Sequence, residues 1–267
     1  MHFLSKKTEK ATFMTNSARK VVGILGNKAL ILKNLIEGHQ KIVFFGGAGV
    51  STESGIPDFR SADGLFNQEL NTTVTPEEIV SHSFLKKHPQ LFFDYYFKHL
   101  IYPSAKPNPA HAYLAALEQQ DKSVTIITQN IDGLHQAAGS KKVLELHGSV
   151  QHNHCELCQK KYSLNELVRD ENGIPRCDAD NGIVRPDVVL YGEALEDVVI
   201  DQSIQAIKEA DLLIIAGTSL SVYPSSGLID FYQGEDLVLI NKSSLTAESQ
   251  ATLVIHQAVG ELFQQLN

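Results

Sequence analysis

The chain has 267 residues, of which 43% are hydrophobic and 20% are charged, and it carries a formal net charge of -8. This length is enough for one large domain, or for a domain with a smaller module, and the composition is typical of a soluble globular protein. No apolar run reaches the roughly 18 residues of a membrane-spanning helix. The negative charge argues against a general affinity for nucleic acid or an anionic membrane, and it favours basic partners such as lysine-rich peptides.

The N-terminal segment, residues 1–20, is basic and polar. It has no continuous apolar core of the roughly 7–15 residues that a secretory signal requires, so we expect either a frayed extension or the lead-in to a first helix. The three cysteines are an odd number, and two of them lie too close together for an ordinary disulfide framework. We therefore expect a cytoplasmic protein whose cysteines bind a metal or stay as free thiols.

Short runs rich in valine, isoleucine and leucine recur along the chain and are typical of buried strands. They are KIVFF (41–45), VTIIT (124–128), VLEL (143–146), DVVLY (187–191), DLLIIA (211–216), DLVLI (236–240) and TLVI (252–255). Segments with helical spacing of apolar residues lie between several of these runs, at 110–120, 196–210 and 258–266. Because strands and helices alternate, the sequence predicts a doubly wound α/β fold with a parallel, Rossmann-like sheet.

Two stretches interrupt this alternation. Residues 60–105 contain aromatic-rich helical pieces such as HPQLFFDYYFKHL, and residues 150–185 carry all three cysteines. We expect them to form a second, smaller module, helical in one part and similar to a zinc knuckle in the other. The predicted division of the domain at 21–267 is therefore a large part (about 21–59, 106–149 and 186–267) and a small module (about 60–105 and 150–185).

The first candidate binding segment, GGAGVSTESGIPDFR, follows the run KIVFF directly. Glycines between a buried strand and a helix let backbone N–H groups approach a phosphate, but a strand-to-helix turn also needs glycine for steric reasons alone. The loop continues with Asp58, Phe59 and Arg60, which add a carboxylate, an aromatic face and a guanidinium. This concentration of functional groups favours a binding loop.

Two further candidates follow predicted strands. Gln129, Asn130 and Asp132 come after the run VTIIT, at the end where open α/β sheets bind their ligands, although an ordinary turn closing on Gly133 would have the same composition. His147 follows the run VLEL. A histidine at such a place is more often structural, but it is also the side chain best suited to proton transfer near neutral pH.

The cysteines suggest a metal site. Cys155 and Cys158 form a C-x-x-C pair, and Cys177 begins a second segment in which Asp180 stands at the next ligand position. Zinc accepts a carboxylate oxygen as well as thiolates, so these four residues can close a tetrahedron. His152 and His154 are nearby substitutes for the fourth ligand. The alternative is a metal-free loop that packing alone holds together.

Together these motifs resemble the sirtuin family, the NAD-dependent protein-lysine deacylases, in its bacterial type. The resemblance extends from about residue 28 to the end of the chain, and six motifs in the right order make it highly specific. They are GAGVSTESGIPDFRS (47–61), TQNIDGLH (128–135), HG (147–148), GIVRPDVVLYGE (182–193), GTSLSVYP (217–224) and LINK (239–242).

The resemblance implies a sheet domain that binds NAD, a small module with helical and zinc-bearing parts, and an acyl-lysine peptide in the cleft between them. It implies that Asn130, Asp132 and His147 are catalytic, with His147 as the general base on a ribose hydroxyl. The products would be free lysine, nicotinamide and O-acyl-ADP-ribose. The positions that match cofactor contacts are Ala48, Thr52, Phe59, Arg60, Gln129, Asn130, Ile131, Asp132, Thr218, Ser219, Asn241 and Ala258.

The same resemblance describes the substrate side. Two strands of the family clamp the peptide main chain, and Val188, Val189 and Val222 match that slot. Family members that remove acidic acyl groups carry a Tyr and an Arg three residues apart, where this chain has Phe93 and Tyr96. We therefore expect uncharged acyl groups, because an acidic one would find no guanidinium partner. These two aromatic residues are also compatible with a purely structural role in the module's core.

Three functions are compatible with these residues. The first is a lysine deacylase, the second is a mono-ADP-ribosyltransferase, and the third is a module that binds NAD or a modified protein without turnover. His147 favours the first, because deacylation requires a base on the ribose and transfer requires it less clearly. A pure binding module has no need of that base.

Overall fold

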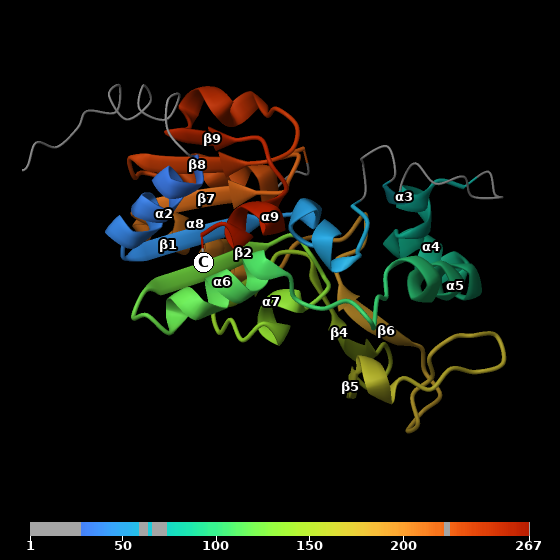
Figure 1. The fold of residues 1–267 in the computed structure, drawn as a ribbon. Helices are drawn as coiled ribbons and strands as arrows, with labels where there is room; N and C mark the ends of the chain where they lie inside the picture. Colours follow the sequence, from blue (N-terminus) through green and yellow to red (C-terminus); the bar gives the residue numbers. More distant parts are fainter. Residues whose placement is uncertain (1–27, 59–63, 66–73, 222–224, 267) are drawn as a thin grey trace, which may run out of the picture.

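The computed structural model describes residues 28–58, 64–65, 74–221 and 225–266, and the predicted extension at 1–20 lies outside them (Figure 1). Its centre is a six-stranded sheet in the order β3-β2-β1-β7-β8-β9, in which every neighbouring pair is parallel. The strands are β1 (Lys41–Gly46), β2 (Ser123–Thr128), β3 (Val143–Glu145), β7 (Leu212–Ala216), β8 (Asp236–Ile240) and β9 (Leu253–Ile255). The predicted Rossmann-like fold is confirmed.

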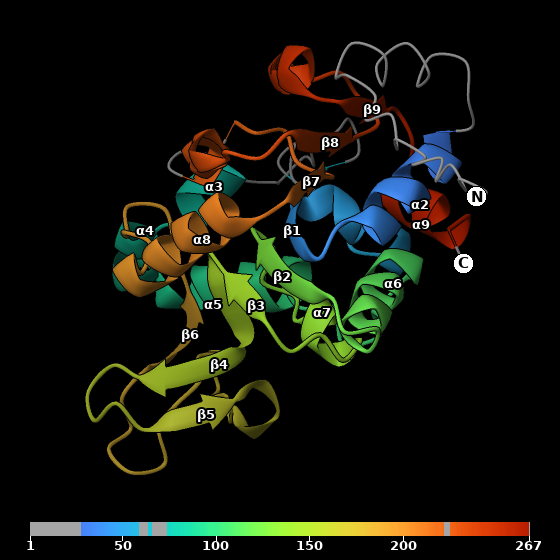
Figure 2. The same ribbon diagram turned by 90° about the vertical axis from the view of Figure 1, so that its left-hand side faces the viewer.

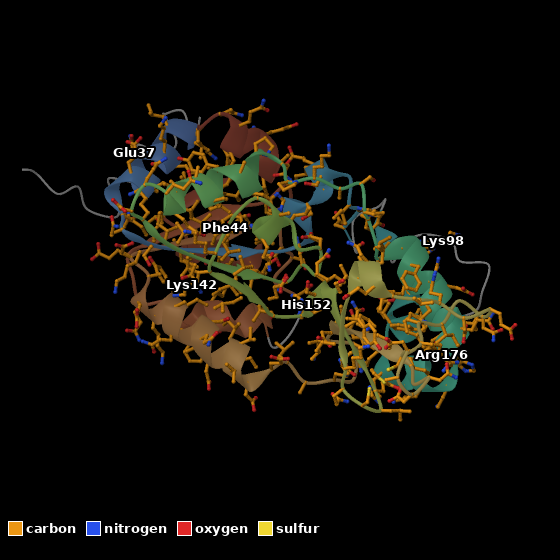
Figure 3. All side chains as sticks on the ribbon, turned by 90° about the horizontal axis from the view of Figure 1, so that it is seen from below. Glu37, Phe44, Lys98, Lys142, His152 and Arg176 are labelled. Atoms are coloured by element: carbon orange, nitrogen blue, oxygen red, sulfur yellow. The ribbon has the colours of Figure 1, made fainter. Side chains whose placement is uncertain are left out.

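Helices cover both faces of this sheet (Figures 1 and 2). Ile42 and Phe44 of β1 pack with α2 (Lys28–Gly38), α6 (Pro109–Glu118) and α9 (Val259–Gln264), and Phe44 lies deep in this layer (Figure 3). Val43 and Phe45 point the other way, toward α8 (Asp197–Glu209) and η5 (Ser225–Phe231). Successive residues of a strand face opposite sides, so a strand covered on both faces is apolar throughout, as KIVFF is.

The order of the strands reverses beside β1. From β1 the chain first adds β2 and β3 on one side, and later adds β7, β8 and β9 on the other. Ligands of open α/β sheets bind at such a switch point, outside the carboxyl ends of the strands. Short helices follow these ends: η1 (Ala48–Val50) and η2 (Thr52–Ser54) after β1, and α7 (Leu134–Ala137) after β2.

A second sheet and a helical group lie beside the parallel sheet (Figures 1 and 2). The sheet has the antiparallel order β5-β4-β6, with β4 (Gly148–Cys155), β5 (Lys161–Ser163) and β6 (Val184–Val188). The helices are α3 (Pro76–Ile79), α4 (His82–Lys87) and α5 (Pro89–His99). They pack on β4 and β6 through one apolar cluster that includes Phe92, Val150 and Val188. Two short helices complete the secondary structure of the described residues, η4 (Leu164–Glu166) and η6 (Thr246–Gln250).

One predicted strand belongs elsewhere. The run at 187–191 was expected among the strands of the parallel sheet, but the strand here is β6, which ends at Val188 and pairs antiparallel with β4. An apolar run predicts that a segment is buried, but it does not predict in which sheet the segment lies, because buried strands of parallel and antiparallel sheets have similar side chains. Among the described residues, none of the helices has the length and apolar character needed to cross a membrane.

Candidate functional site

A cavity of about 1220 Å³ lies at the carboxyl ends of the central strands. One wall consists of the segments that follow β1, β2, β7 and β8. The opposite wall comes from the segment after α5 and from residues 188–193, which follow β6. The volume and the position at the switch point suit an extended ligand such as a dinucleotide together with a second substrate.

The glycines after β1 have a packing role. A Cβ atom on Gly47 would lie 2.7 Å from the Cβ of Thr218, and one on Gly49 would lie 2.7 Å from the Cα of Gly217. The N–H of Gly49 donates to the Gly217 carbonyl (2.8 Å), and the N–H of Gly47 donates to the Ala216 carbonyl (3.1 Å). These glycines therefore let the β1 and β7 loops touch, and their N–H groups are bonded to protein carbonyls.

A buried polar network joins the β1 and β2 loops. Ser51 is 1% exposed, and its Oγ donates to Oδ2 of Asp132 (2.7 Å) and accepts from Nδ2 of Asn130 (3.0 Å). The second carboxylate oxygen of Asp132 accepts from the N–H of Leu134 (2.9 Å), at the start of α7. Thr218 donates through Oγ1 to Oε1 of Gln129 (2.9 Å). These bonds fix both side chains, Asn130 and Asp132, at the cavity wall.

His147 follows β3 and faces the same cavity. Its Nδ1 lies 2.8 Å from the carbonyl oxygen of Gln129, which can only accept, so Nδ1 carries the proton and Nε2 has a lone pair to offer. Burial lowers the pKa of His147 below its ordinary value, and the bond to Gln129 opposes this shift. The imidazole is therefore neutral near pH 7, as a general base must be.

The structure brings the predicted site residues together. Phe59, Arg60 and Val222 lie outside the described residues. All the other predicted catalytic, cofactor and substrate positions line the cavity: Ala48, Thr52, Gln129, Asn130, Ile131, Asp132, His147, Val188, Val189, Thr218, Ser219, Asn241 and Ala258.

Sequence reasoning missed two residues that organise the site. Ser51 joins Asn130 to Asp132, and Asn108 donates through Nδ2 to the Val50 carbonyl (2.7 Å) and to Oγ of Ser54 (3.1 Å). Ser51 stands inside the motif GAGVST, so its position was a signal. Asn108 precedes Pro109 as the N-cap of α6, which explains its residue type without suggesting its contact with the β1 loop.

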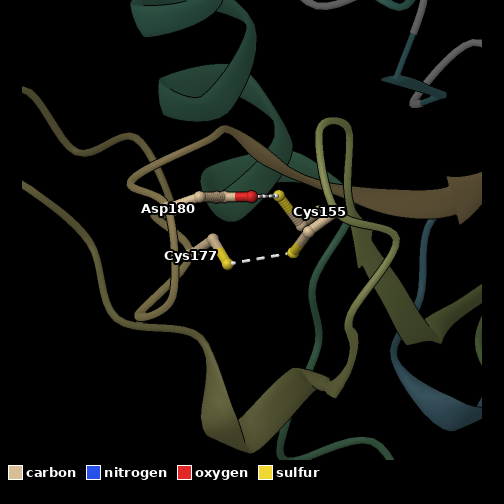
Figure 4. Close-up of side chains that lie close together, drawn as sticks. Cys155, Cys177 and Asp180 are labelled. Atoms are coloured by element: carbon tan, nitrogen blue, oxygen red, sulfur yellow. Dashed lines mark hydrogen bonds between the residues drawn. The ribbon is translucent and has the colours of Figure 1, made fainter.

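The cysteines and Asp180 converge at the end of the antiparallel sheet (Figure 4). The ligand atoms of Cys155, Cys158, Cys177 and Asp180 all lie within 4.8 Å of one another. Oδ1 of Asp180 is 3.3 Å from Sγ of Cys155, and the sulfurs of Cys158 and Cys177 are 3.6 Å apart. Zinc–sulfur bonds of about 2.3 Å place the sulfurs of a tetrahedral site roughly 3.8 Å apart, so this donor set fits zinc.

The histidines considered as substitute ligands are not part of this group. Nδ1 of His154 pairs with Oδ1 of Asp187 on β6. His152 lies opposite Ser163 in the β4–β5 pairing. Alternate residues of a strand face opposite sides, so a position next to Cys155 in the sequence does not bring His154 to the metal-binding side of β4.

Phe93 and Tyr96 belong to the core of the helical group. Each is 1% exposed, and their rings meet edge to face with centroids 6.2 Å apart. Neither residue is among those that line the cavity. Among the described lining residues, the only lysine or arginine is Lys242, which follows β8. The structural interpretation of these two aromatic residues is therefore the better one.

The fold and the cavity define a class, a doubly wound α/β protein with a dinucleotide-sized cavity at its switch point and a second module beside it. The chain belongs to the Sir2 family, whose model matches residues 47–224, more than half of the chain. The NAD-dependent protein deacetylase of Clostridium perfringens (strain 13 / Type A) is 58% identical over 232 residues, which cover 86% of this chain and 95% of the relative. That of Staphylococcus aureus (strain Mu50) is 41% identical over 235 residues, which cover 88% and 96%.

Solved structures of Sir2 proteins share the fold. A structure of Sir2 with a p53 peptide and NAD+ has a TM-score of 0.76 and 37% identity, and covers 88% of this chain and 95% of its own. A Sir2 variant with a deacetylated p53 peptide and 3'-O-acetyl ADP-ribose has a TM-score of 0.81 and 35% identity, and covers 90% and 97%. The family resemblance predicted from the motifs is thus confirmed.

Proposed function

We propose that this protein removes acetyl and similar uncharged acyl groups from protein lysines with NAD as co-substrate, and releases nicotinamide and O-acyl-ADP-ribose. One observation carries the proposal: Asn130, Asp132 and His147 face a single cavity at the switch point of the sheet. The relatives named as NAD-dependent protein deacetylases, and the Sir2 structures with NAD+ and acetylated peptide, support the same function.

NAD supplies a glycosidic bond to nicotinamide, whose cleavage builds positive charge on the ribose. Asp132 contributes a fixed negative charge at the cavity wall, and Ser51 keeps its carboxylate from turning away. Asn130 offers a carboxamide, which Ser51 orients, and the backbone N–H of Asn130 donates to Oγ1 of Thr128 at the end of β2. Because these groups are fixed before the ligand binds, they need no rearrangement as the charge develops.

His147 is the proposed general base, and it accepts a proton from a ribose hydroxyl at Nε2. The carbonyl of Gln129 holds Nδ1–H and so fixes the tautomer and the direction of the ring. Because burial lowers the pKa of His147, a larger fraction of the base is neutral than for an ordinary histidine at the same pH. The acid limb of the pH–rate profile should therefore lie below the ordinary histidine value.

The other cavity residues have proposed binding roles. Ala48, Thr52, Gln129 and Ile131 would contact the nicotinamide and ribose half of NAD, and Phe59 and Arg60 complete this set from the sequence. Thr218, Ser219, Asn241 and Ala258 would contact the adenosine half. In this proposal the large part (21–59, 106–149 and 186–267) binds NAD, and the small module (60–105 and 150–185) closes the cleft.

The proposed partners are proteins or peptides with acylated lysines. Val188 and Val189 line the cavity next to His147, where a peptide main chain can pair with the residues after β6. The net charge of -8 suits lysine-rich partners. Lys242 is the only lysine or arginine among the described lining residues, and it lies at the proposed adenosine end. An acidic acyl group beside His147 would therefore have no lysine or arginine partner.

We also propose a structural zinc site of three thiolates and one carboxylate, formed by Cys155, Cys158, Cys177 and Asp180. Backbone N–H groups of Leu157 and Ala179 point at the sulfurs of Cys155 and Cys177, both at 3.4 Å, as expected for thiolates that carry negative charge. The site lies at the end of the small module and has no proposed part in the chemistry. Three reduced thiols also favour a cytoplasmic location.

Mass spectrometry of an acetyl-lysine peptide incubated with NAD tests the function. The proposal predicts a loss of acetyl from the peptide together with nicotinamide and O-acetyl-ADP-ribose. A gain of ADP-ribose on the protein or peptide would instead indicate a mono-ADP-ribosyltransferase. Binding of NAD without any product would indicate a module without turnover.

A further inference from the structure

Glu53 joins two walls of the cavity that are 207 residues apart in the sequence. Its carboxylate accepts hydrogen bonds from the backbone N–H groups of Gly260 (2.5 Å) and Glu261 (2.8 Å), in the first turn of α9. Thr52, next to Glu53, lines the cavity on one side, and Ala258, just before α9, lines it on the other. In Figure 1, α9 lies beside the short helices after β1.

This contact suits both partners. The first N–H groups of a helix have no acceptor within the helix and carry partial positive charge, so an ionised carboxylate is the strongest side-chain partner they can have. Within the described part of the chain, Glu53 is the only residue whose side chain accepts hydrogen bonds from the N–H groups of Gly260 and Glu261. Glu53 is not among the described residues that line the cavity, so we assign it to the link between the walls and not to the ligand.

The residue type at position 260 supports the same contact. A Cβ atom on Gly260 would lie 2.8 Å from Oε2 of Glu53 and 2.9 Å from its Cδ. Any side chain at Gly260 would therefore push the carboxylate away from the start of α9. The close approach of the Glu53 carboxylate favours glycine at this position, whereas the backbone angles of Gly260 do not, because it is not among the described glycines with positive φ.

We propose that Glu53 is a positioning residue for NAD. It holds the loop with Ala48 and Thr52 against the segment with Gln257 and Ala258, and so sets the spacing of the cofactor walls before the ligand arrives. Without this link, part of the free protein has the two walls too far apart to bind NAD. NAD then binds only the fraction of molecules with the correct spacing, and its apparent affinity falls. The inference rests on the proposed assignment of this cavity to NAD.

Three variants of the full chain test the proposal: Glu53→Ala, Glu53→Gln and Gly260→Ala. The Michaelis constants for NAD and for an acetyl-lysine peptide are measured separately, and NAD binding is measured by calorimetry. Loss of a charge-assisted link predicts an increase of about tenfold in both Kd and KM for NAD, with kcat and the peptide KM within about twofold. Glu53→Gln, which keeps one acceptor oxygen, should lie between Glu53→Ala and the wild type.

The double variant sharpens the test. Glu53→Ala and Gly260→Ala break the same contact from opposite sides, so combining them should weaken NAD binding no more than the stronger single change. The matched control is Glu166→Ala, since Glu166 accepts from the N–H of Ser163 (2.7 Å) in the small module. This control removes the same kind of carboxylate–backbone bond and should leave the KM for NAD unchanged.

The proposal is overturned if Glu53→Ala keeps the Kd for NAD within twofold of the wild type, or if it changes the constants for NAD and for the peptide equally. It is also overturned if the two single changes add in the double variant. A wild-type protein without turnover would refute the proposed deacetylase activity, whereas NAD calorimetry would still decide the role of Glu53.

Discussion

Ser51→Ala should reduce the activity of this protein strongly, although Ser51 has no proposed contact with the reacting atoms. Its hydroxyl joins Asn130 and Asp132, and it is 1% exposed. The change removes one bond to a carboxylate and one bond to a carboxamide. Oδ1 of Asp132 remains bonded to the N–H of Leu134, so Asp132 keeps one of its two anchors.

The magnitude follows from these contacts. A hydrogen bond to a charged group contributes about 1.5–3 kcal/mol, and a neutral one about 1 kcal/mol. Water from the cavity can replace part of both, so we take the lower end, a total of about 2 kcal/mol. If the full effect appears in the transition state, kcat/KM for NAD falls roughly 30-fold.

The assay is steady-state deacetylation of an acetyl-lysine peptide at varied NAD concentration. Ser54→Ala is the matched control, because Ser54 lies in the same loop and accepts from Asn108 (3.1 Å) without contacting Asn130 or Asp132. We expect the control to stay within about threefold of the wild type. If Ser51→Ala also stays within threefold, the network does not support the chemistry and the reasoning is wrong.

Four other outcomes are expected. His147→Ala should lower deacetylation by roughly 10²–10⁴-fold without unfolding the protein, and a rate within a few-fold of the wild type would contradict its role as base. Succinyl-lysine should be a weaker substrate than acetyl-lysine, because Lys242 is the only lysine or arginine among the described lining residues and lies at the proposed adenosine end; a side-by-side kcat/KM comparison checks this. Burial lowers the pKa of His111 to about 4 and that of His135 to about 3. Between pH 6.5 and 4 the unfolded chain therefore binds more protons than the folded protein, and the melting temperature should fall as the pH drops through this range. Replacing His135 with Leu should make the melting temperature depend less on pH, and an unchanged dependence would refute the explanation. Asp180→Cys should raise the zinc affinity and the melting temperature, because thiolate is a softer ligand than carboxylate. The variant should also resist a chelator better than the wild type. If elemental analysis finds the wild-type protein free of zinc and it still has full activity, the site is vestigial.

Several features of this protein could be predicted from the sequence by itself. The apolar runs in β1, β2, β7 and β8 indicated a sheet covered on both faces. Side chains on both faces of these strands are indeed buried. The motifs around Asn130, Asp132 and His147 predicted residues that do line one cavity. The spacing of the three cysteines predicted their convergence with Asp180. In each case the sequence pattern is local, because the burial of a strand and the spacing of metal ligands depend on residues within a short segment.

Only the tertiary structure decided how distant segments meet. The run at 187–191 was apolar, but its pairing with β4 depends on where the chain leaves the parallel sheet. Ser51 is a small polar residue in a loop until the β2 loop brings Asn130 and Asp132 to its hydroxyl. Glu53 is one acidic residue among many until α9 packs beside it. Such contacts join residues 79 to 207 positions apart in the sequence. The packing of whole helices and strands brings these residues together, and this packing leaves no periodic pattern in the sequence from which the contacts could be predicted.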